Sequence, residues 1–144
     1  MTQNNSIDKV EVITRYYESG ALYSETPCVN GKMHGIARLY YESGALKREA
    51  PYVNGYVHGI IKIYCESGVL QYETSCVNGK EHGILKSYYE SGALRYETPY
   101  VNGKVQGITR FYYDSDKSNI FRLTLYEKDH RVASVKLSIN GDLS

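Results

Sequence analysis

Apolar and polar residues recur along this chain with a fixed period of 24 residues. Four consecutive copies occupy residues 20–43, 44–67, 68–91 and 92–115 without insertion or deletion, and ten of the 24 positions are identical in all four. Each copy holds two runs rich in Tyr, Ile and Val, which are typical of strands. A period of this length predicts a stack of similar units, because no single unit can bury its own apolar side chains.

Two turn signals punctuate each copy. The first is Glu-Ser-Gly, as at Glu42-Ser43-Gly44, and the second is Asn-Gly, as at Asn54-Gly55. Asn-Gly between apolar runs is a strong hairpin signal, because both residues tolerate positive φ. Turns that recur every 10–14 residues leave little room for helices. We therefore expect an all-β fold: a single elongated, twisted antiparallel meander sheet, that is, a β-hairpin solenoid of 24-residue repeats.

The turns also predict a register, if both are two-residue loops. Around Ser43-Gly44, Arg38 then lies opposite Glu49, and the later copies pair Lys62 with Glu73 and Lys86 with Glu97. Around Asn54-Gly55, the same arithmetic places Tyr52 opposite Val57 and Glu49 beside Ile60. A bulge at the turn glycine would shift this scheme.

This register gives the sheet two unlike faces. We expect the more apolar one to be the core side, with Tyr52, Val57, Ile61, Ile63, Cys65, Leu70 and their repeat equivalents. The other should carry the histidines, Ile60, Lys62, Tyr64, Glu73, Val77 and their equivalents. Like residues should form lanes along the sheet about 10 Å apart, two strands per step.

The chain is expected to form a single repeat domain over residues 1–144. Residues 1–11 read as a polar N-terminal tail, residues 12–19 as a half repeat, and residues 116–144 as a divergent C-terminal cap in which 121–126 and 133–139 still alternate like strands. Atypical terminal units commonly cap the exposed edges of solenoids. No apolar run approaches the ~20 residues that a membrane span needs, and the tail lacks the apolar core of a secretory signal.

Charge and cysteine content restrict the possible partners and the cellular compartment. The chain has 17 basic and 16 acidic residues, a net charge of +1, which argues against nucleic acid as a partner. Cys28 and Cys76 share a repeat position and should lie ~19 Å apart, too far for a disulfide. Cys65 is displaced from Cys76 along the strand direction. We expect three free thiols, which suit a reducing compartment and a cytoplasmic location.

The repeat resembles a known family. The pattern Tyr-Tyr-Glu-Ser-Gly-x-Leu, followed by Val-Asn-Gly-Lys-x-x-Gly, is similar to MORN repeats, specifically the bacterial variant, over residues 12–115. The resemblance implies a β-hairpin solenoid with a binding or scaffolding role, and related bacterial proteins look like antitoxin or immunity components. MORN repeats also accompany lipid kinase and lysine methyltransferase domains, but we expect no second domain here and do not carry those activities over.

One lane of candidate site residues consists of histidines. It comprises His34, His58 and His82, with Gln106 in the fourth copy. A metal ion needs ligands that converge within a few ångströms, and a spacing of ~10 Å excludes one shared ion. We therefore expect a structural position before the following glycine, with no metal and no cofactor.

Two further lanes are candidates for partner binding. The cations are Arg38, Lys62, Lys86 and Arg110, and the aromatic lane is Tyr40, Tyr64, Tyr88 and Tyr112. The cations suit lipid phosphates or an acidic protein surface, but the favoured explanation is cross-strand pairing with Glu49, Glu73 and Glu97, because these glutamates lie where the register predicts them. Arg110 is expected to lack such a partner, because the next strand has diverged. The tyrosines suit either a core ladder or an interface.

The sequence therefore predicts a non-enzymatic module that binds another macromolecule. No P-loop, G-x-G-x-x-G, H-E-x-x-H or G-x-S-x-G motif is present, and no catalytic residues stand out. The first hypothesis is a protein-binding scaffold, including an antitoxin- or immunity-like partner. The alternative is a module for anionic phospholipid or phosphoinositide headgroups, with peripheral membrane contact. A homodimer through an exposed face or a sheet end is a further expectation.

Overall fold

The computed structural model describes residues 7–114 and 116–137, and in this part of the chain it contains strands and no helix. It holds no helix long and apolar enough to cross a membrane among these residues. The 15 strands form one sheet. They are β1 (Val10–Tyr16), β2 (Leu22–Val29), β3 (Lys32–Met33), β4 (Gly35–Tyr40), β5 (Leu46–Val53), β6 (Tyr56–Val57), β7 (Gly59–Tyr64), β8 (Leu70–Val77), β9 (Lys80–Glu81), β10 (Gly83–Tyr88), β11 (Leu94–Val101), β12 (Lys104–Val105), β13 (Gly107–Tyr113), β14 (Asp116–Glu127) and β15 (His130–Lys136).

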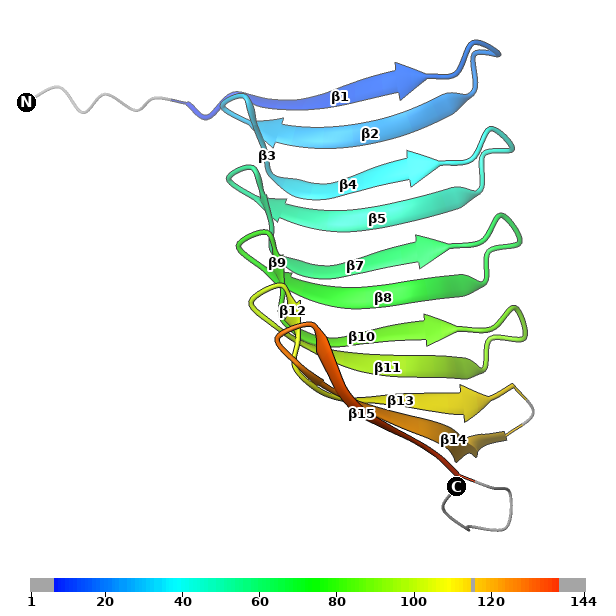
Figure 1. Cartoon of the computed structure of the whole chain (residues 1–144). Helices are drawn as coiled ribbons and strands as arrows, with labels where there is room; N and C mark the ends of the chain where they lie inside the picture. The colour runs from blue at the N-terminus through cyan, green and yellow to red at the C-terminus, as the bar shows by residue number, and fades with distance from the viewer. Residues whose placement is uncertain (1–6, 115, 138–144) are drawn as a thin grey trace, which may run out of the picture.

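The long strands pair in the order in which they occur in the chain. The path runs β1-β2-β4-β5-β7-β8-β10-β11-β13-β14-β15, and β3, β6, β9 and β12 pair with the strand before each of them. Figure 1 shows the hairpins stacked one above another, with the Asn-Gly turns on one side and the Glu-Ser-Gly turns on the other. The predicted antiparallel meander of hairpin repeats is confirmed.

The Asn-Gly turns tie each copy to the one before it. Asn54 has φ 51° and Gly55 has φ 88°, the left-handed conformation that a tight hairpin needs. The Gly55 amide then donates to the carbonyl of Met33 in the previous copy at 2.8 Å. The next two copies repeat this bond from Gly79 and Gly103. Each turn therefore closes its own hairpin and also stacks on its neighbour.

The Glu-Ser-Gly turns are longer than the two-residue loops that the sequence suggested. The Gly44 amide donates to the carbonyl of Tyr41 at 2.9 Å, and the Tyr41 amide donates to the carbonyl of Ala45 at 2.8 Å. Three residues lie between Tyr41 and Ala45, and the register shifts by one residue beside the turn. In the next copy this bulge pairs Leu70 with Tyr64, although strict alternation had assigned them to opposite faces.

A second correction concerns the register after the Asn-Gly turn. Tyr52 pairs with Val57 as predicted, but Glu49 pairs with Lys62 and not with Ile60. Between these two pairs, the segment that follows the turn is two residues longer than the segment of β5 opposite it. The extra length falls around His58, between β6 and β7, and Gly59 follows with φ 123°. Because the excess is two residues, the side chains of β7 stay on their predicted faces.

Most of the buried residues do lie on the predicted core face, but most of them have small side chains. The buried residues on the predicted core face are mostly serine, threonine, alanine and cysteine, whereas Ile61 and Ile63 are only half-buried. We call this side the small-residue face. It includes Ser24, Cys28, Ala37, Ala50, Cys76, Ser87, Thr98, Thr109 and Thr124. Larger neighbours such as Tyr72 and Tyr96, which pair with Ser87 from both sides, flank these small groups.

The two ends of the sheet differ. β1 begins at Val10, so the ordered sheet starts inside the predicted 1–11 tail, whose first six residues lie outside the described part. At the other end β14 and β15 follow the four copies, in the region predicted to be a cap; residues 138–144 also lie outside the described part. The cap reproduces the stacking bonds of the turns, because Asp129 donates its amide to the Val105 carbonyl and accepts the Val105 amide at its carboxylate.

Gly59→Ala is expected to destabilise the sheet. A Cβ at Gly59 would lie 2.7 Å from Cγ of Pro51 and would be held at φ 123°, whereas a Cβ at Gly55 would meet nothing within 4 Å. We expect a loss of about 2 kcal/mol or more in the free energy of unfolding, followed by urea denaturation. Pro51→Ala in the Gly59→Ala background should recover part of it. A loss no larger than that of Gly55→Ala would contradict the close contact.

Candidate functional site

One face of the sheet carries an alternating lane of acids and bases. The paired residues run Glu25, Arg38, Glu49, Lys62, Glu73, Lys86, Glu97 and Arg110 across β2, β4, β5, β7, β8, β10, β11 and β13. We call this side the charged face. Because of the two-residue excess after each Asn-Gly turn, every glutamate from Glu49 onward has a cation on both neighbouring strands. Opposite charges placed directly across a sheet stabilise it modestly.

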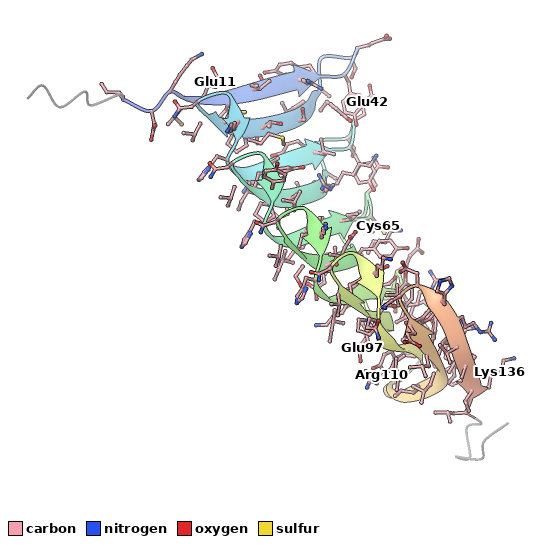
Figure 2. The ribbon with its side chains drawn as sticks, turned by 60° about the vertical axis from the view of Figure 1, so that its left-hand side comes forward. Glu11, Glu42, Cys65, Glu97, Arg110 and Lys136 are labelled. Atoms are coloured by element: carbon pink, nitrogen blue, oxygen red, sulfur yellow. The ribbon has the colours of Figure 1, made fainter. Side chains whose placement is uncertain are left out.

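Close ion pairs form within this lane. Arg38 Nε lies 4.0 Å from Glu49, Lys86 Nζ lies 3.5 Å from Glu73, and Arg110 lies 3.4 Å from Glu97. Figure 2 shows Glu97 and Arg110 together near the C-terminal end of the stack. The expectation that Arg110 lacks a partner was wrong: its partner stands on the preceding strand, and Leu123 stands opposite on the diverged one.

The tyrosine lane is part of the same network. Each tyrosine hydroxyl donates to the glutamate fifteen residues before it, at distances of 2.8–3.3 Å. The pairs are Tyr40 with Glu25, Tyr64 with Glu49, Tyr88 with Glu73, and Tyr112 with Glu97. Tyr112 is buried and the other three are half-buried. The structure thus brings the predicted tyrosines and cations together around shared carboxylates.

This surrounding raises the pKa of each tyrosine in the lane. Burial is the largest cause in every case, and the nearby glutamate adds to it because a carboxylate disfavours a phenolate beside it. For Tyr88 the two causes raise the pKa to about 12. These hydroxyls therefore serve as hydrogen-bond donors to the glutamates and not as bases or nucleophiles near neutral pH.

Exposed isoleucines form a separate lane on the charged face. The isoleucine at the seventeenth position of the repeat is identical in all four copies. Its side chain is 41–54% exposed throughout the lane, which consists of Ile36, Ile60, Ile84 and Ile108. Each pairs across the ladder with a residue that lacks charge: Pro51, Ser75, Pro99 and Leu125, respectively. The sequence placed Ile60 on this face but beside Glu49; its pairing with Ser75 belongs to the register across the Glu-Ser-Gly turn, which was predicted correctly.

The histidine lane lies apart from this network. His34, His58 and His82 are exposed and precede the positive-φ glycines. Their backbone amides donate to the carbonyls of Pro27, Pro51 and Ser75. In the described ranges, no group of three His, Cys, Asp or Glu residues is placed to hold a metal ion.

The cysteines are all free thiols, as the sequence predicted. Cys28 and Cys76 are buried on the small-residue face, and Cys65 is half-buried beside a turn. Burial raises the pKa of the Cys76 thiol. A buried thiol with a raised pKa is a poor nucleophile, so Cys76 is a packing residue. Cys65 stands where other copies have Tyr41 or Tyr89, whose hydroxyls donate to a carbonyl in the next copy.

Two hairpins of the stack match a family model. Residues 33–54 and 81–102 match the MORN repeat variant, and these segments cover β4–β5 and β10–β11 with the Asn of the following turn. No curated protein matches the chain. The match supports the resemblance drawn from the repeat pattern. MORN repeats are commonly binding modules for proteins or membrane lipids, and they are not an enzyme family.

The glutamate–tyrosine bond predicts a response to alkaline pH. A folded-state pKa of about 12 for Tyr88 exceeds the ordinary value of 10, so the folded state keeps a proton that the unfolded chain loses. This stabilisation is fully present below pH 10 and is lost as the pH rises toward 12. Denaturation midpoints across this range should fall less steeply in Tyr88→Phe than in the unmodified protein.

Glu73→Gln provides the matched test. Removing the carboxylate charge should lower the pKa of Tyr88, while burial keeps it above the ordinary value. Ultraviolet titration of the phenolate, with Tyr88→Phe to identify the signal, measures it. Glu42→Gln, at an exposed turn carboxylate, is the control (Figure 2). An unchanged titration in Glu73→Gln would show that the bond is absent in solution.

Proposed function

We propose that this protein is a non-enzymatic binding module that recognises another protein through its charged face. The observation that carries the proposal is the exposed isoleucine lane, which runs beside a lane of mutually neutralised charges from β4 to β13. Exposed apolar groups in a continuous row mark interaction surfaces. The predicted residues, the tyrosines and cations, form the polar rows beside it.

Identity among the copies supports the same face. Five side chains within the strands are the same in every copy: the leucine that begins the first long strand, the glutamate, the isoleucine, the tyrosine and the valine of the Asn-Gly hairpin. In the third copy four of these, Glu73, Ile84, Tyr88 and Val77, lie on the charged face. The small-residue face varies, with Leu39, Ile63, Ser87 and Phe111 at one shared position. A partner on the charged face would meet the same groups every ~10 Å.

The face is also hollowed where a partner side chain could fit. A depression of about 260 Å³ lies between Ile60 and Ile84, where Ser75 takes the place of the proline found in the other copies. A smaller apolar hollow of about 190 Å³ lies at the C-terminal end, beside Ile108 and Leu125. Apolar hollows flanked by hydrogen-bonding groups are suitable places for the anchoring side chains of a protein interface.

Charge favours a protein over an anionic membrane as the partner. A lipid-headgroup surface needs an excess of cations, whereas this lane holds four glutamates for four cations. Arg38, Lys86 and Arg110 each lie within 4.0 Å of a glutamate carboxylate. A dedicated protein partner, of the kind that antitoxin or immunity components have, and a reducing cytoplasmic setting for the free thiols complete the proposal.

The test compares two pairs of lysine substitutions. Ile60→Lys/Ile84→Lys charges the isoleucine lane, and Ser43→Lys/Ser67→Lys adds the same two charges, also one repeat apart, on exposed turns. A partner is first captured from lysate of the native organism, purified and then titrated against each variant. We expect the isoleucine pair to weaken binding by about 100-fold or more, since two apolar anchors are lost, and the turn pair to leave it unchanged.

The two remaining candidates have their own readouts. Tyr64→Ala/Tyr88→Ala removes two hydroxyl donors and should also weaken partner binding, because Glu49 and Glu73 lose their positioning bonds. Flotation with anionic liposomes at low salt tests the lipid alternative. Binding to liposomes together with no protein captured would contradict the proposal, as would a captured protein that binds the isoleucine pair as tightly as the unmodified chain.

A further inference from the structure

The first strand of the sheet has an open edge. β1 pairs with β2 along its whole length, and among the described residues no strand pairs with its other side. Figure 1 shows β1 at the end of the stack. Val10, Val12 and Tyr16 are 59–72% exposed there. Such an edge offers unpaired amides and carbonyls to any strand of suitable sequence.

The alternation of β1 shows which of its groups are available. The Tyr17 amide donates to the Ala21 carbonyl, and the Lys9 carbonyl accepts a hydrogen bond from the Asn30 amide. The odd-numbered residues of β1 therefore direct their backbone groups toward β2. The amides and carbonyls of Val10, Val12, Thr14 and Tyr16 therefore point away from the sheet. An incoming antiparallel strand would bond to these four residues.

The sequence of β1, Val-Glu-Val-Ile-Thr-Arg-Tyr, is complementary to itself when reversed. With Ile13 placed on a two-fold axis, the whole strand overlaps its copy, and Val12 meets Thr14 while Val10 meets Tyr16 as hydrogen-bonded pairs. Glu11 then meets Arg15 of the copy, and Arg15 meets Glu11, at the non-hydrogen-bonded positions where side chains approach most closely. A shift of the centre to Val12 would instead oppose Arg15 to Lys9, two like charges.

The two charged positions are departures from the repeat. By alignment with the four copies, Glu11 stands where they have glycine, as at Gly35, and Arg15 stands where they have Leu39, Ile63, Ser87 or Phe111. Thr14 in turn replaces the cation of the charged lane, as at Arg38, which pairs with a glutamate on the strand before it. β1 thus lacks the cation that would pair with the glutamate of a further copy of the repeat. It has instead Glu11 and Arg15, whose opposite charges would pair between two β1 strands.

The opposite edge does not share this property. β15 reads His-Arg-Val-Ala-Ser-Val-Lys, and its reversal about Ala133 would place His130 against Lys136 and Arg131 against Val135. Figure 2 shows Glu11 and Lys136 at opposite ends of the molecule. Only β1 therefore combines an open edge with a self-complementary strand among the described strands at the sheet ends.

We propose that two copies of this protein associate through their β1 strands, antiparallel about Ile13, to form one continuous sheet with two-fold symmetry. A two-fold axis normal to the sheet keeps the charged faces of both copies on the same side, so the isoleucine lanes would continue across the junction. The association is closed, because each copy uses its single β1 edge. It is separate from partner binding, so either can fail without the other.

Charge exchange tests the proposal on the full chain. Glu11→Arg gives a strand with two arginines at the paired positions, and Arg15→Glu gives one with two glutamates. Each alone should dimerise at least about tenfold more weakly, because both contacts become repulsive. An equimolar mixture of the two should form a heterodimer, and the Glu11→Arg/Arg15→Glu double variant should regain the homodimer. Sedimentation equilibrium against the 16.4 kDa chain mass measures all four.

Two further variants separate the edge from general effects. Val12→Pro removes an outward amide without touching the bonds to β2 and should also abolish the dimer. Arg131→Glu changes charge on β15 and should leave it intact. A chain that stays monomeric up to about 100 μM, a dimer that the single charge variants do not weaken, or single variants that neither mixing nor the double exchange restores would each overturn the proposal.

Discussion

The two residues that each copy gains after its Asn-Gly turn are the constraint on which the rest of the molecule depends. They leave the ladder around His58, and Gly59 returns the chain to it at φ 123°. This conformation suits glycine, and it brings Gly59 against the ring of Pro51. Without the excess, Glu49 would face Ile60; with it, Glu49 faces Lys62. The Lys86–Glu73 and Arg110–Glu97 ion pairs and the tyrosine bonds all follow from that register.

Shared carboxylates explain how a one-layer sheet can carry so many charged groups on one face. Glu73 accepts a hydrogen bond from Tyr88 and lies 3.5 Å from Lys86, with Lys62 on its other side. Partial burial strengthens such contacts relative to fully exposed pairs. The acidic and basic side chains of the lane neutralise each other. The exposed isoleucines are therefore the groups of this face whose burial by a partner costs the least desolvation energy.

The sequence predicted the hairpins, their order and, away from the bulge that pairs Leu70 with Tyr64, the assignment of side chains to faces, because these depend on periodicity and turn residues. The pairing across the Glu-Ser-Gly turn was right for Arg38 and Glu49. The excess at His58 was missed, and the bulge beside that turn was considered but not built into the predicted register, because the apolar pattern does not determine loop length. Arg110 was misjudged for a related reason: its glutamate lies on the strand before it, and that neighbour appears only once the register is corrected.

The register of β5 against β7 is the claim that one measurement tests most directly. In isotopically labelled protein, nuclear Overhauser spectroscopy reports which backbone protons face each other across adjacent strands. The structure predicts cross-strand contacts between Glu49 and Lys62 and between Arg48 and Ile63. Contacts between Glu49 and Ile60 instead would show that the two extra residues stay in the ladder, and the carboxylates shared between neighbouring strands would then not exist.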